Sequence, residues 1–226
     1  MISKIGFLPE IAAADVAFVK LKCLYDSYRD DDAACFWQSS DGAFLSLYGR
    51  NMIISDGDID IDELRDFLRF TFPQYIFCSE NLARELNAGR TEPINVMYRF
   101  GDAAGETLGD TLSSKEIYDI LNCPSFTMPD YADFAVDWCH RLNRGFADYY
   151  GLKGKCAAIS FNSGDYAVIN GIASREKGCG GKALNAITEK NCGRHIFACC
   201  EDSVTGFYEK YGFKKLSKRF ALINEY

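Results

Sequence analysis

The sequence predicts an α/β protein built from two lobes. Short apolar runs typical of strands alternate with stretches of helical apolar spacing, and the order hairpin, strand, helix, strand, helix occurs in both halves. Apolar residues make up 48% of the 226-residue chain and aromatic residues 14%, which is enough for a packed core and excludes disorder. The polar, glycine-bearing stretch 90–113 is the expected boundary region, with lobes at 1–94 and 95–226.

The first lobe contains four expected strands and two expected helices. Ser39-Ser40-Asp41-Gly42 joins two aromatic runs as a hairpin turn. Asp60 with Glu63 forms a capping-box variant before a helix, and Ser79 can cap a second helix that runs to about Asn87 and is terminated by Gly89. The strands are expected at 33–38, 43–48, 52–55 and 75–79.

The second lobe repeats this order after one strand at 95–100 and two helices at 114–123 and 130–144. Turn residues separate the next three strands, which are expected at 146–150, 156–161 and 166–174. A glycine-rich loop at 175–181 leads into a helix. The remaining elements are expected as a helix at 181–190, a strand at 194–199, a helix at 203–211 and a strand or hairpin at 213–223.

The distribution of charge excludes some classes of partner. The net charge of −7 consists of −11 over residues 1–174 and +4 over residues 175–226. An acidic body disfavours nucleic acid, whereas the basic C-terminal quarter could receive one anionic ligand or be ordinary solvated surface. No apolar run approaches the roughly 18 residues of a membrane span, and Glu10 and Asp15 interrupt the N-terminal apolar stretch. We therefore expect no membrane association and a cytoplasmic protein.

Two residue clusters could suggest a metal, but neither has suitable spacing. Cys199 and Cys200 point to opposite faces of an expected strand, which disfavours a shared zinc site. The acidic run 56–62 lacks the glycine and glutamate that a calcium loop needs at its sixth and twelfth positions. We predict no metal, and we interpret the ten cysteines as free thiols because most lie in apolar strings.

The clearest local signal is the glycine-rich loop at Arg175–Lys182, which reads R-E-K-G-C-G-G-K. Such a loop presents backbone N–H groups to an anion at the positive end of a helix, although a simple tight turn has the same composition. It is not a Walker A loop, because Ala183 stands where Ser or Thr would bind magnesium. It is not a dinucleotide-binding fingerprint either, because the glycine spacing differs.

Two strings together resemble the GNAT family of acetyl-CoA-dependent N-acyltransferases. R-x-x-G-x-G at 175–180 is similar to the pyrophosphate loop of that family, and F-Y-E-K-Y-G-F at 207–213 is similar to its fourth helix. The stretch 200–213 also resembles the arylalkylamine N-acetyltransferases. Here Ser174 runs directly into Arg175, without the proline-containing stretch that many members have before the loop.

The resemblance implies a fold, an activity and a set of site residues. The fold would be a GNAT-type mixed, mostly antiparallel sheet flanked by helices, with 1–94 as a degenerate related lobe. The activity would be transfer of an acetyl group from acetyl-CoA to a primary amine, with Tyr208 as general acid. Residues expected to bind the cosubstrate are Ile172, Ala173 and Ser174 for the pantetheine arm, and Lys177, Gly178, Cys179, Gly180, Gly181 and Lys182 for the pyrophosphate.

Periodicity bears on the role of Tyr208. Val204, Phe207 and Tyr211 share one helical face and are expected in the core, which would leave Tyr208 off that face. No general base can be assigned: Tyr166, Asn170, Glu201 and Asp202 lie nearby in sequence, and Asp202 is more simply a helix N-cap.

Several features of function remain open at this level. The acidic body suggests a cationic acceptor such as a small amine, a polyamine or a lysine, and a homodimer is compatible with the sequence. The acidic run 56–62 stands where the second lobe has its glycine-rich loop, so the first lobe is expected to bind no CoA. The alternative function is a non-catalytic CoA-binding module with a regulatory or protein-interaction role.

Overall fold

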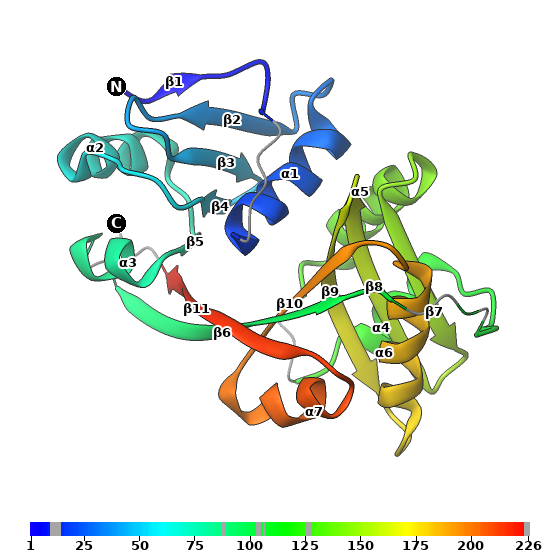
Figure 1. Ribbon diagram of the computed structural model, residues 1–226. Helices are drawn as coiled ribbons and strands as arrows, with labels where there is room; N and C mark the ends of the chain where they lie inside the picture. The colour runs from blue at the N-terminus through cyan, green and yellow to red at the C-terminus, as the bar shows by residue number, and fades with distance from the viewer. Residues whose placement is uncertain (10–14, 87–88, 103–104, 106, 125–127, 224–226) are drawn as a thin grey trace. The chain divides into compact units, whose positions relative to one another are not determined.

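The computed structural model describes residues 1–9, 15–86, 89–102, 105, 107–124 and 128–223 (Figure 1). The chain divides into two compact units. Unit 1 comprises Met1–Val96, Cys200–Thr205 and Leu216–Tyr226, and unit 2 comprises Met97–Cys199 and Gly206–Lys215.

The sheet of unit 1 has the strand order β1-β2-β3-β4-β5-β11. β2, β3 and β4 form an antiparallel meander, β4 and β5 are parallel, and β11 is antiparallel to β5. The strands are β1 (Ser3–Lys4), β2 (Ala34–Gln38), β3 (Phe44–Tyr48), β4 (Asn51–Ile54), β5 (Tyr75–Cys78) and β11 (Lys214–Ile223), the last entering unit 1 at Leu216.

Helices cover both faces of this sheet. α1 (Val16–Tyr28) packs on β2, β3 and β4 through an aromatic cluster that contains Phe18, Phe36 and Phe44. α2 (Ile61–Thr71) and α3 (Glu80–Leu86) bury leucines against the alternate side chains of the same strands. Because side chains alternate along a strand, both faces of the sheet are apolar.

The sheet of unit 2 has the strand order β6-β10-β9-β8-β7. β7, β8 and β9 form an antiparallel meander, and β9 and β10 are parallel. The strands are β6 (Arg90–Phe100, in unit 2 from Met97), β7 (Ala147–Leu152), β8 (Cys156–Ser163), β9 (Tyr166–Ser174) and β10 (His195–Cys200).

The helices of unit 2 also lie on both faces. α4 (Ser114–Leu121) and α5 (Tyr131–Asn143) pack on the face that carries Ile159. α6 (Cys179–Lys190) covers the face that carries Ser160, whose Oγ accepts a hydrogen bond of 2.9 Å from Asn191 just after that helix. A 3-10 turn (Asp202–Val204) precedes α7 (Thr205–Lys210).

The two units share one topology, which confirms the predicted α/β class with a mixed, mostly antiparallel sheet. Each has a three-stranded meander, a helix that crosses to a parallel strand, and a further short helix: β2-β3-β4-α2-β5-α3 in unit 1 and β7-β8-β9-α6-β10-α7 in unit 2. The sequence predicted this repeated order.

Other expectations have mixed outcomes. α1 was not expected at all, and the expected helix 203–211 is a 3-10 turn followed by a shorter α-helix.

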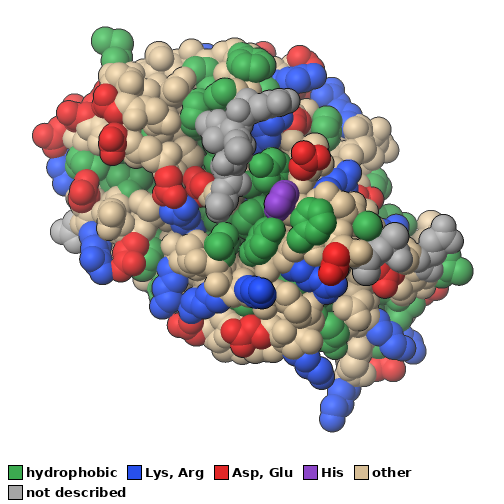
Figure 2. Space-filling model, viewed as in Figure 1, with side chains coloured by type: hydrophobic (Ala, Val, Ile, Leu, Met, Phe, Trp, Pro, Cys, Tyr) green, Lys and Arg blue, Asp and Glu red, His purple; other side chains and the backbone are tan. Residues whose placement is uncertain are grey.

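All ten cysteines are free thiols, as predicted. Within the described ranges, no helix combines the length and apolar character needed to cross a bilayer. Acidic and basic side chains are interspersed on the face drawn in Figure 2.

Candidate functional site

β9 leaves part of one edge open in unit 2. It pairs with β10 only from Tyr166–His195 to Ile169–Ala198, but it continues to Ser174. Its other edge pairs with β8 as far as Ser174. Among the described strands, none pairs with β9 on the β10 side beyond Ile169. The backbone N–H and C=O groups of this edge can therefore bind a ligand that carries amide groups.

A β-bulge marks the point where this open edge begins. Ile159 of β8 pairs with Gly171 and the next residue, Ser160, pairs with Ile169, so Asn170 is an extra residue on β9. Its side chain is exposed. Bulges turn backbone groups and side chains out of the regular ladder and are frequent beside active sites. In the sequence, Asn170 stands out only as a neighbour of the motif, and the Gly171 that follows it is the one sequence signal for a bulge.

The loop after β9 is held by local hydrogen bonds. Ser174 Oγ donates to the Glu176 carbonyl at 2.6 Å, and the Arg175 N–H donates to the Lys155 carbonyl at 2.7 Å. Lys155 Nζ also lies 3.1 Å from Glu176 Oε2, and this hydrogen bond raises the pKa of Lys155. The backbone of the loop is thus positioned without using Lys177.

The N-terminus of α6 follows directly and has no side-chain cap. Gly178 is its N-cap residue, with φ of 88°, a left-handed conformation that a residue with Cβ adopts only with strain. A Cβ there would contact nothing, so the backbone is open to an incoming group. Uncapped N–H groups at the positive end of a 12-residue helix favour an anion.

The structure arranges the predicted cosubstrate residues along this one strand, loop and helix. Ile172 and Ala173 on β9 are half-buried, whereas Ser174 at its end is exposed. The two lysines and Gly178 are exposed, and Cys179 and Gly181 are buried under the first turn of α6. These residues are Lys177, Gly178, Cys179, Gly180, Gly181 and Lys182, and they form a continuous stretch around the helix N-terminus.

The second motif lies against the first. A Cβ on Gly180 would be 3.9 Å from the ring of Phe207, and a Cβ on Gly181 would overlap the hydroxyl of Tyr211. The two strings that carry the resemblance, 175–180 and 207–213, therefore meet in unit 2 at the first turn of α6.

The expected core face of α7 is wrong. Tyr208, with 7% exposure, is the buried residue of this helix, and Val204 is 39% exposed. Phe207 and Phe213 pack edge-on against the Tyr208 ring, with centroids 5.4 and 5.5 Å away. The physical reason is that Val204 belongs to the 3-10 turn, which rotates the following residues relative to a continuous α-helix. Tyr208 is thus a packed and rigid ring.

The prediction that Asp202 is a helix N-cap is also wrong. Glu201 occupies the cap position of the 3-10 turn, and Asp202 Oδ1 accepts a hydrogen bond of 2.8 Å from Asn95 in unit 1.

An aromatic cluster around His195 was missed by sequence analysis. The His195 ring stacks on Tyr98 at 5.9 Å between centroids and contacts Phe100 and Tyr166, and its Nδ1 lies 2.9 Å from the Tyr98 hydroxyl oxygen. The cluster combines strands that are far apart in sequence, so no local pattern could predict it.

Unit 1 has an acidic loop at the equivalent place, between β4 and α2. Arg219 of β11 donates to Asp56 at 2.6 and 2.7 Å and to Asp15 at 2.7 Å. Burial by itself would lower the pKa of Arg219, but hydrogen bonds and charge from Asp56 and Asp15 raise it overall, so the guanidinium stays charged. Two carboxylates share this one guanidinium, so the acidic loop keeps a net negative charge. Across the described residues, no group of three or more His, Cys, Asp or Glu side chains could hold a metal.

Comparisons with known proteins bear on the fold. The sequence matches no protein-family model and no curated protein. A Drosophila protein solved as a structural genomics target is similar with a TM-score of 0.55 at 12% identity, covering 84% of this chain and 79% of that one. A Pyrococcus horikoshii protein described as a candidate acetyltransferase gives a TM-score of 0.55 at 10% identity, covering 92% of this chain and 78% of that one.

A further solved structure is a tandem GNAT protein from the clavulanic acid biosynthesis pathway, with a TM-score of 0.48 at 11% identity, covering 84% of this chain and 82% of that one. At identities this low, the two structures with a TM-score of 0.55 show a common fold and nothing about substrate. With the strand order and the two equivalent units described above, the chain has the two-lobed α/β fold with a mixed, mostly antiparallel sheet that its sequence predicted.

Proposed function

We propose that this protein is an N-acyltransferase that moves an acetyl group from acetyl-CoA to a primary amine, with unit 2 as the catalytic unit. One observation carries the proposal: an open strand edge at Asn170–Ser174 leads directly to the uncapped N-terminus of α6. The pantetheine arm of CoA contains amide groups that suit the strand edge, and its diphosphate suits the helix N-terminus. The order of the two sites along the chain matches the order of these groups along CoA.

The residues present fit the cosubstrate. Gly178 and Gly180 leave the backbone accessible, and Lys177 and Lys182 are exposed beside it. Neither lysine forms an ion pair with the residues that the structure describes. The loop itself needs neither lysine for its own hydrogen bonds. Both positive charges therefore remain available to a diphosphate.

The reaction needs few groups from the protein. The neutral amine attacks the thioester carbonyl, so that a C–N bond forms and the carbonyl oxygen gains charge. The nitrogen then loses a proton to solvent, and the tetrahedral species re-forms its C=O bond and expels the CoA sulfur. We assign the proton that the sulfur takes up to the hydroxyl of Tyr208. The packing of Tyr208 between Phe207 and Phe213 supports this role, because a fixed ring holds its hydroxyl at one place.

The acceptor is proposed to be a cationic amine. The support is the charge of the chain, which is −7 overall. Such a charge raises the local concentration of cations by long-range attraction, and this effect weakens as salt is added.

The test is release of free thiol from acetyl-CoA in the presence of a panel of amines, together with calorimetry for CoA binding. At 100 times its dissociation constant, CoA should stabilise the protein by about 2.7 kcal/mol. Gly180→Asp should abolish this stabilisation, because a carboxylate at the helix N-terminus repels the diphosphate. Its Cβ would make only an ordinary contact of 3.5 Å with Ser174, so the variant should fold.

Gly6→Asp is the matched control, since it adds the same charge in unit 1 at a position where a Cβ meets nothing. Full CoA binding by Gly180→Asp would contradict the assignment of the loop. CoA binding without thiol release for any amine would instead identify a non-catalytic CoA-binding module.

A further inference from the structure

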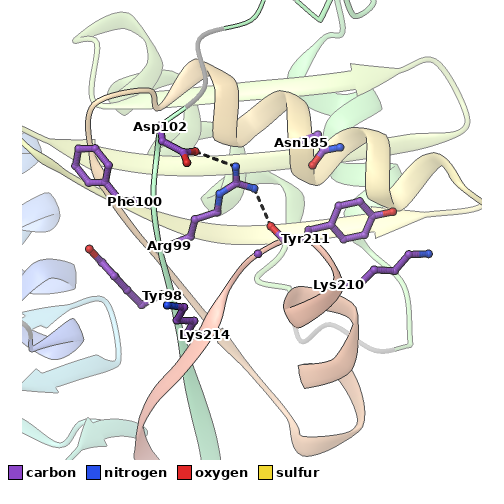
Figure 3. Close-up of a pocket in the computed structure, with 9 residues that line it drawn as sticks. Tyr98, Arg99, Phe100, Asp102, Asn185, Lys210, Tyr211 and Lys214 are labelled. Atoms are coloured by element: carbon purple, nitrogen blue, oxygen red, sulfur yellow. Dashed lines mark hydrogen bonds and ion pairs between the residues drawn. The ribbon is translucent and has the colours of Figure 1, made fainter.

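Each unit has a cavity, and the two cavities have opposite charge. The cavity of unit 2 is lined by Arg99, Lys210 and Lys214, adjoins α6 and belongs to the site already described (Figure 3). The cavity of unit 1 has a volume of about 630 Å³, which is within the range of small-molecule sites. The proposed chemistry gives it no role. We call it the acidic cavity.

The acidic cavity has the position in unit 1 that the proposed cosubstrate site has in unit 2. It lies between the loop after β4, the start of α2, the start of α3 and Arg219 of β11. The corresponding elements of unit 2 are the loop after β9, the start of α6 and the start of α7. However, α2 begins at Asp60, whose carboxylate accepts the Glu63 N–H at 2.8 Å, whereas α6 has no side-chain cap. The helix N-terminus in unit 1 is therefore closed to an anion.

Negative charge exceeds positive charge in the acidic cavity. The charged groups of its lining are four carboxylates and one guanidinium, which belong to Asp56, Asp58, Glu80, Glu85 and Arg219. Asp56 is paired with Arg219, and Glu80 with an arginine one turn along α3. Asp58 and Glu85 are exposed and form no ion pair with the residues that the structure describes. Two carboxylates are thus available to a cation.

Arg219 gives an independent indication of a ligand. Its side chain lines the cavity, is 9% exposed, and donates from both Nη atoms to Asp56 and from Nη2 to Asp15. Its Nε–H is buried and has no acceptor among the groups that the structure describes. A buried donor without an acceptor is unfavourable, so the site suits a ligand that brings an oxygen. A neutral carbonyl suits it better than a carboxylate, because Asp15 and Asp56 already surround the guanidinium with negative charge.

The apolar part of the lining favours an aliphatic stem on the same ligand. Ile59 and Ile61 are half-buried and pack against the core of unit 1, and Leu82 is 8% exposed. Across the described residues, no cluster of three or more His, Cys, Asp or Glu side chains could hold a metal ion. An organic cation with an apolar stem would use both the carboxylates and the isoleucines, as long basic side chains do on protein surfaces.

We infer that the acidic cavity binds a lysine residue of a peptide. The ε-ammonium lies on Asp58 and Glu85, the aliphatic stem on Ile59 and Ile61, and a backbone carbonyl accepts from the Nε–H of Arg219. Unit 1 is then a recognition unit for basic peptides. All lining residues belong to unit 1, so the inference does not rest on acetyl transfer in unit 2.

The experiment is calorimetry on the full chain with four probes and no acetyl-CoA. Nα-acetyl-L-lysine amide represents the residue in a peptide, and its norleucine analogue lacks only the ammonium. Pentylamine keeps the stem and the ammonium but has no carbonyl, and free L-lysine has a carboxylate instead of an amide. The carbonyl is removed from the probe rather than its donor from the protein, because loss of Arg219 would leave two carboxylates unpaired.

Nα-acetyl-L-lysine amide should bind about tenfold more tightly than its norleucine analogue, the size expected for two exposed ion pairs. It should also bind more tightly than pentylamine, which has the same charge, and than free L-lysine. Its affinity should fall as salt is added, because both carboxylates are exposed.

The variants are Asp58→Asn, Glu85→Gln and both together. Asp32→Asn is the matched control, because it removes a charge from an exposed residue of unit 1 that does not line the cavity. Each single variant should weaken binding of the lysine probe by about threefold and the double variant by about tenfold, whereas Asp32→Asn should keep it. Asp58 and Glu85 contribute to the fold through backbone carbonyls, which accept from Ser39 and Arg65, so the variants should fold.

Four results would each overturn the inference: no binding of the lysine probe, equal affinity for the norleucine analogue, equal affinity for pentylamine, or unchanged affinity in the double variant. Tighter binding of free L-lysine would overturn the peptide and identify a free amino acid as the ligand. CoA affinity should be the same in every variant, because the proposed cosubstrate site lies in unit 2. Loss of this inference therefore leaves the proposed function intact, and absence of CoA binding leaves this inference intact.

Discussion

Three glycines in one turn of the candidate site should respond differently to replacement by alanine. Gly178 has φ of 88° and open space around it. A Cβ on Gly180 would meet its nearest neighbour, Ser174 Cβ, at an ordinary 3.5 Å. A Cβ on Gly181 would overlap the Tyr211 hydroxyl and approach Cε1 of that ring to 3.1 Å. The same chemical change therefore tests backbone strain, helix propensity and packing separately.

The expected free energies follow from these environments. Gly180→Ala should raise the stability by up to about 1 kcal/mol, because alanine is the better helix former. Gly181→Ala has the same propensity gain but must displace Tyr211, and overpacking costs about 1–3 kcal/mol. It should therefore be about 1–3 kcal/mol less stable than Gly180→Ala. Gly178→Ala should lose about 1–2 kcal/mol through its left-handed backbone.

The assay is thermal unfolding of each variant, in which 1 kcal/mol corresponds to about 2–4 °C for a chain of this size. A second arm repeats Gly181→Ala in a Tyr211→Ala background, where no ring is left to displace. The difference between Gly180→Ala and Gly181→Ala should then disappear, which gives a coupling of about 1–3 kcal/mol between positions 181 and 211. Equal melting temperatures of the two single variants would refute the contact between α7 and α6.

Three further predictions concern catalysis, stoichiometry and pH. Tyr208→Phe keeps the packed ring, so CoA affinity should survive while kcat falls at least tenfold. The fall should be strongest below about pH 8.5, where the thiol of CoA is more stable than its thiolate. Unchanged steady-state kinetics would remove Tyr208 from the mechanism. Calorimetry should give one CoA per chain, because Asp56 presents a carboxylate at the place in unit 1 where a second diphosphate would bind. A stoichiometry of two CoA per chain would contradict this prediction. Hydrogen bonds from Lys153 and Ser113 hold the pKa of Glu116 at about 2, below its usual 4.5, so its contribution to stability is present above pH 4.5 and lost as pH falls toward 2. The difference in Tm between the unaltered protein and Glu116→Gln should shrink over that interval, and a difference that persists at pH 2 would show that the charge is not its cause.

Helix starts could be predicted because their signals are local. Asp60 accepts a hydrogen bond of 2.8 Å from the Glu63 N–H, and Asp130 accepts one of 2.9 Å from the Asp133 N–H, each three residues along the chain. Ser79 likewise accepts from the Leu82 N–H at 3.3 Å. A cap needs only its own turn of helix, so sequence spacing specifies it.

α1 could not be predicted by periodicity, because 10 of its 13 residues are buried. A helix enclosed on most of its circumference has no polar stripe to mark its period. The same limit applies to the β9 bulge and to the Tyr98–His195 contact, which depend on partners from other strands. Tyr208 was placed on the wrong face for a local reason, since a 3-10 turn and an α-helix cannot be distinguished by apolar spacing over so few residues.

The pairing of β11 with β5 has a consequence for biosynthesis. Phe220 pairs with Cys78, and Arg219 is the buried partner of Asp15 and Asp56. A strand and an ion-pair network of unit 1 therefore come from residues that follow unit 2 in the sequence. A ribosome synthesises the whole of unit 2 before it reaches these residues. Unit 1 therefore stays incomplete during translation, with β5 exposed as an unpaired edge, and it closes only when residues 216–223 leave the exit tunnel.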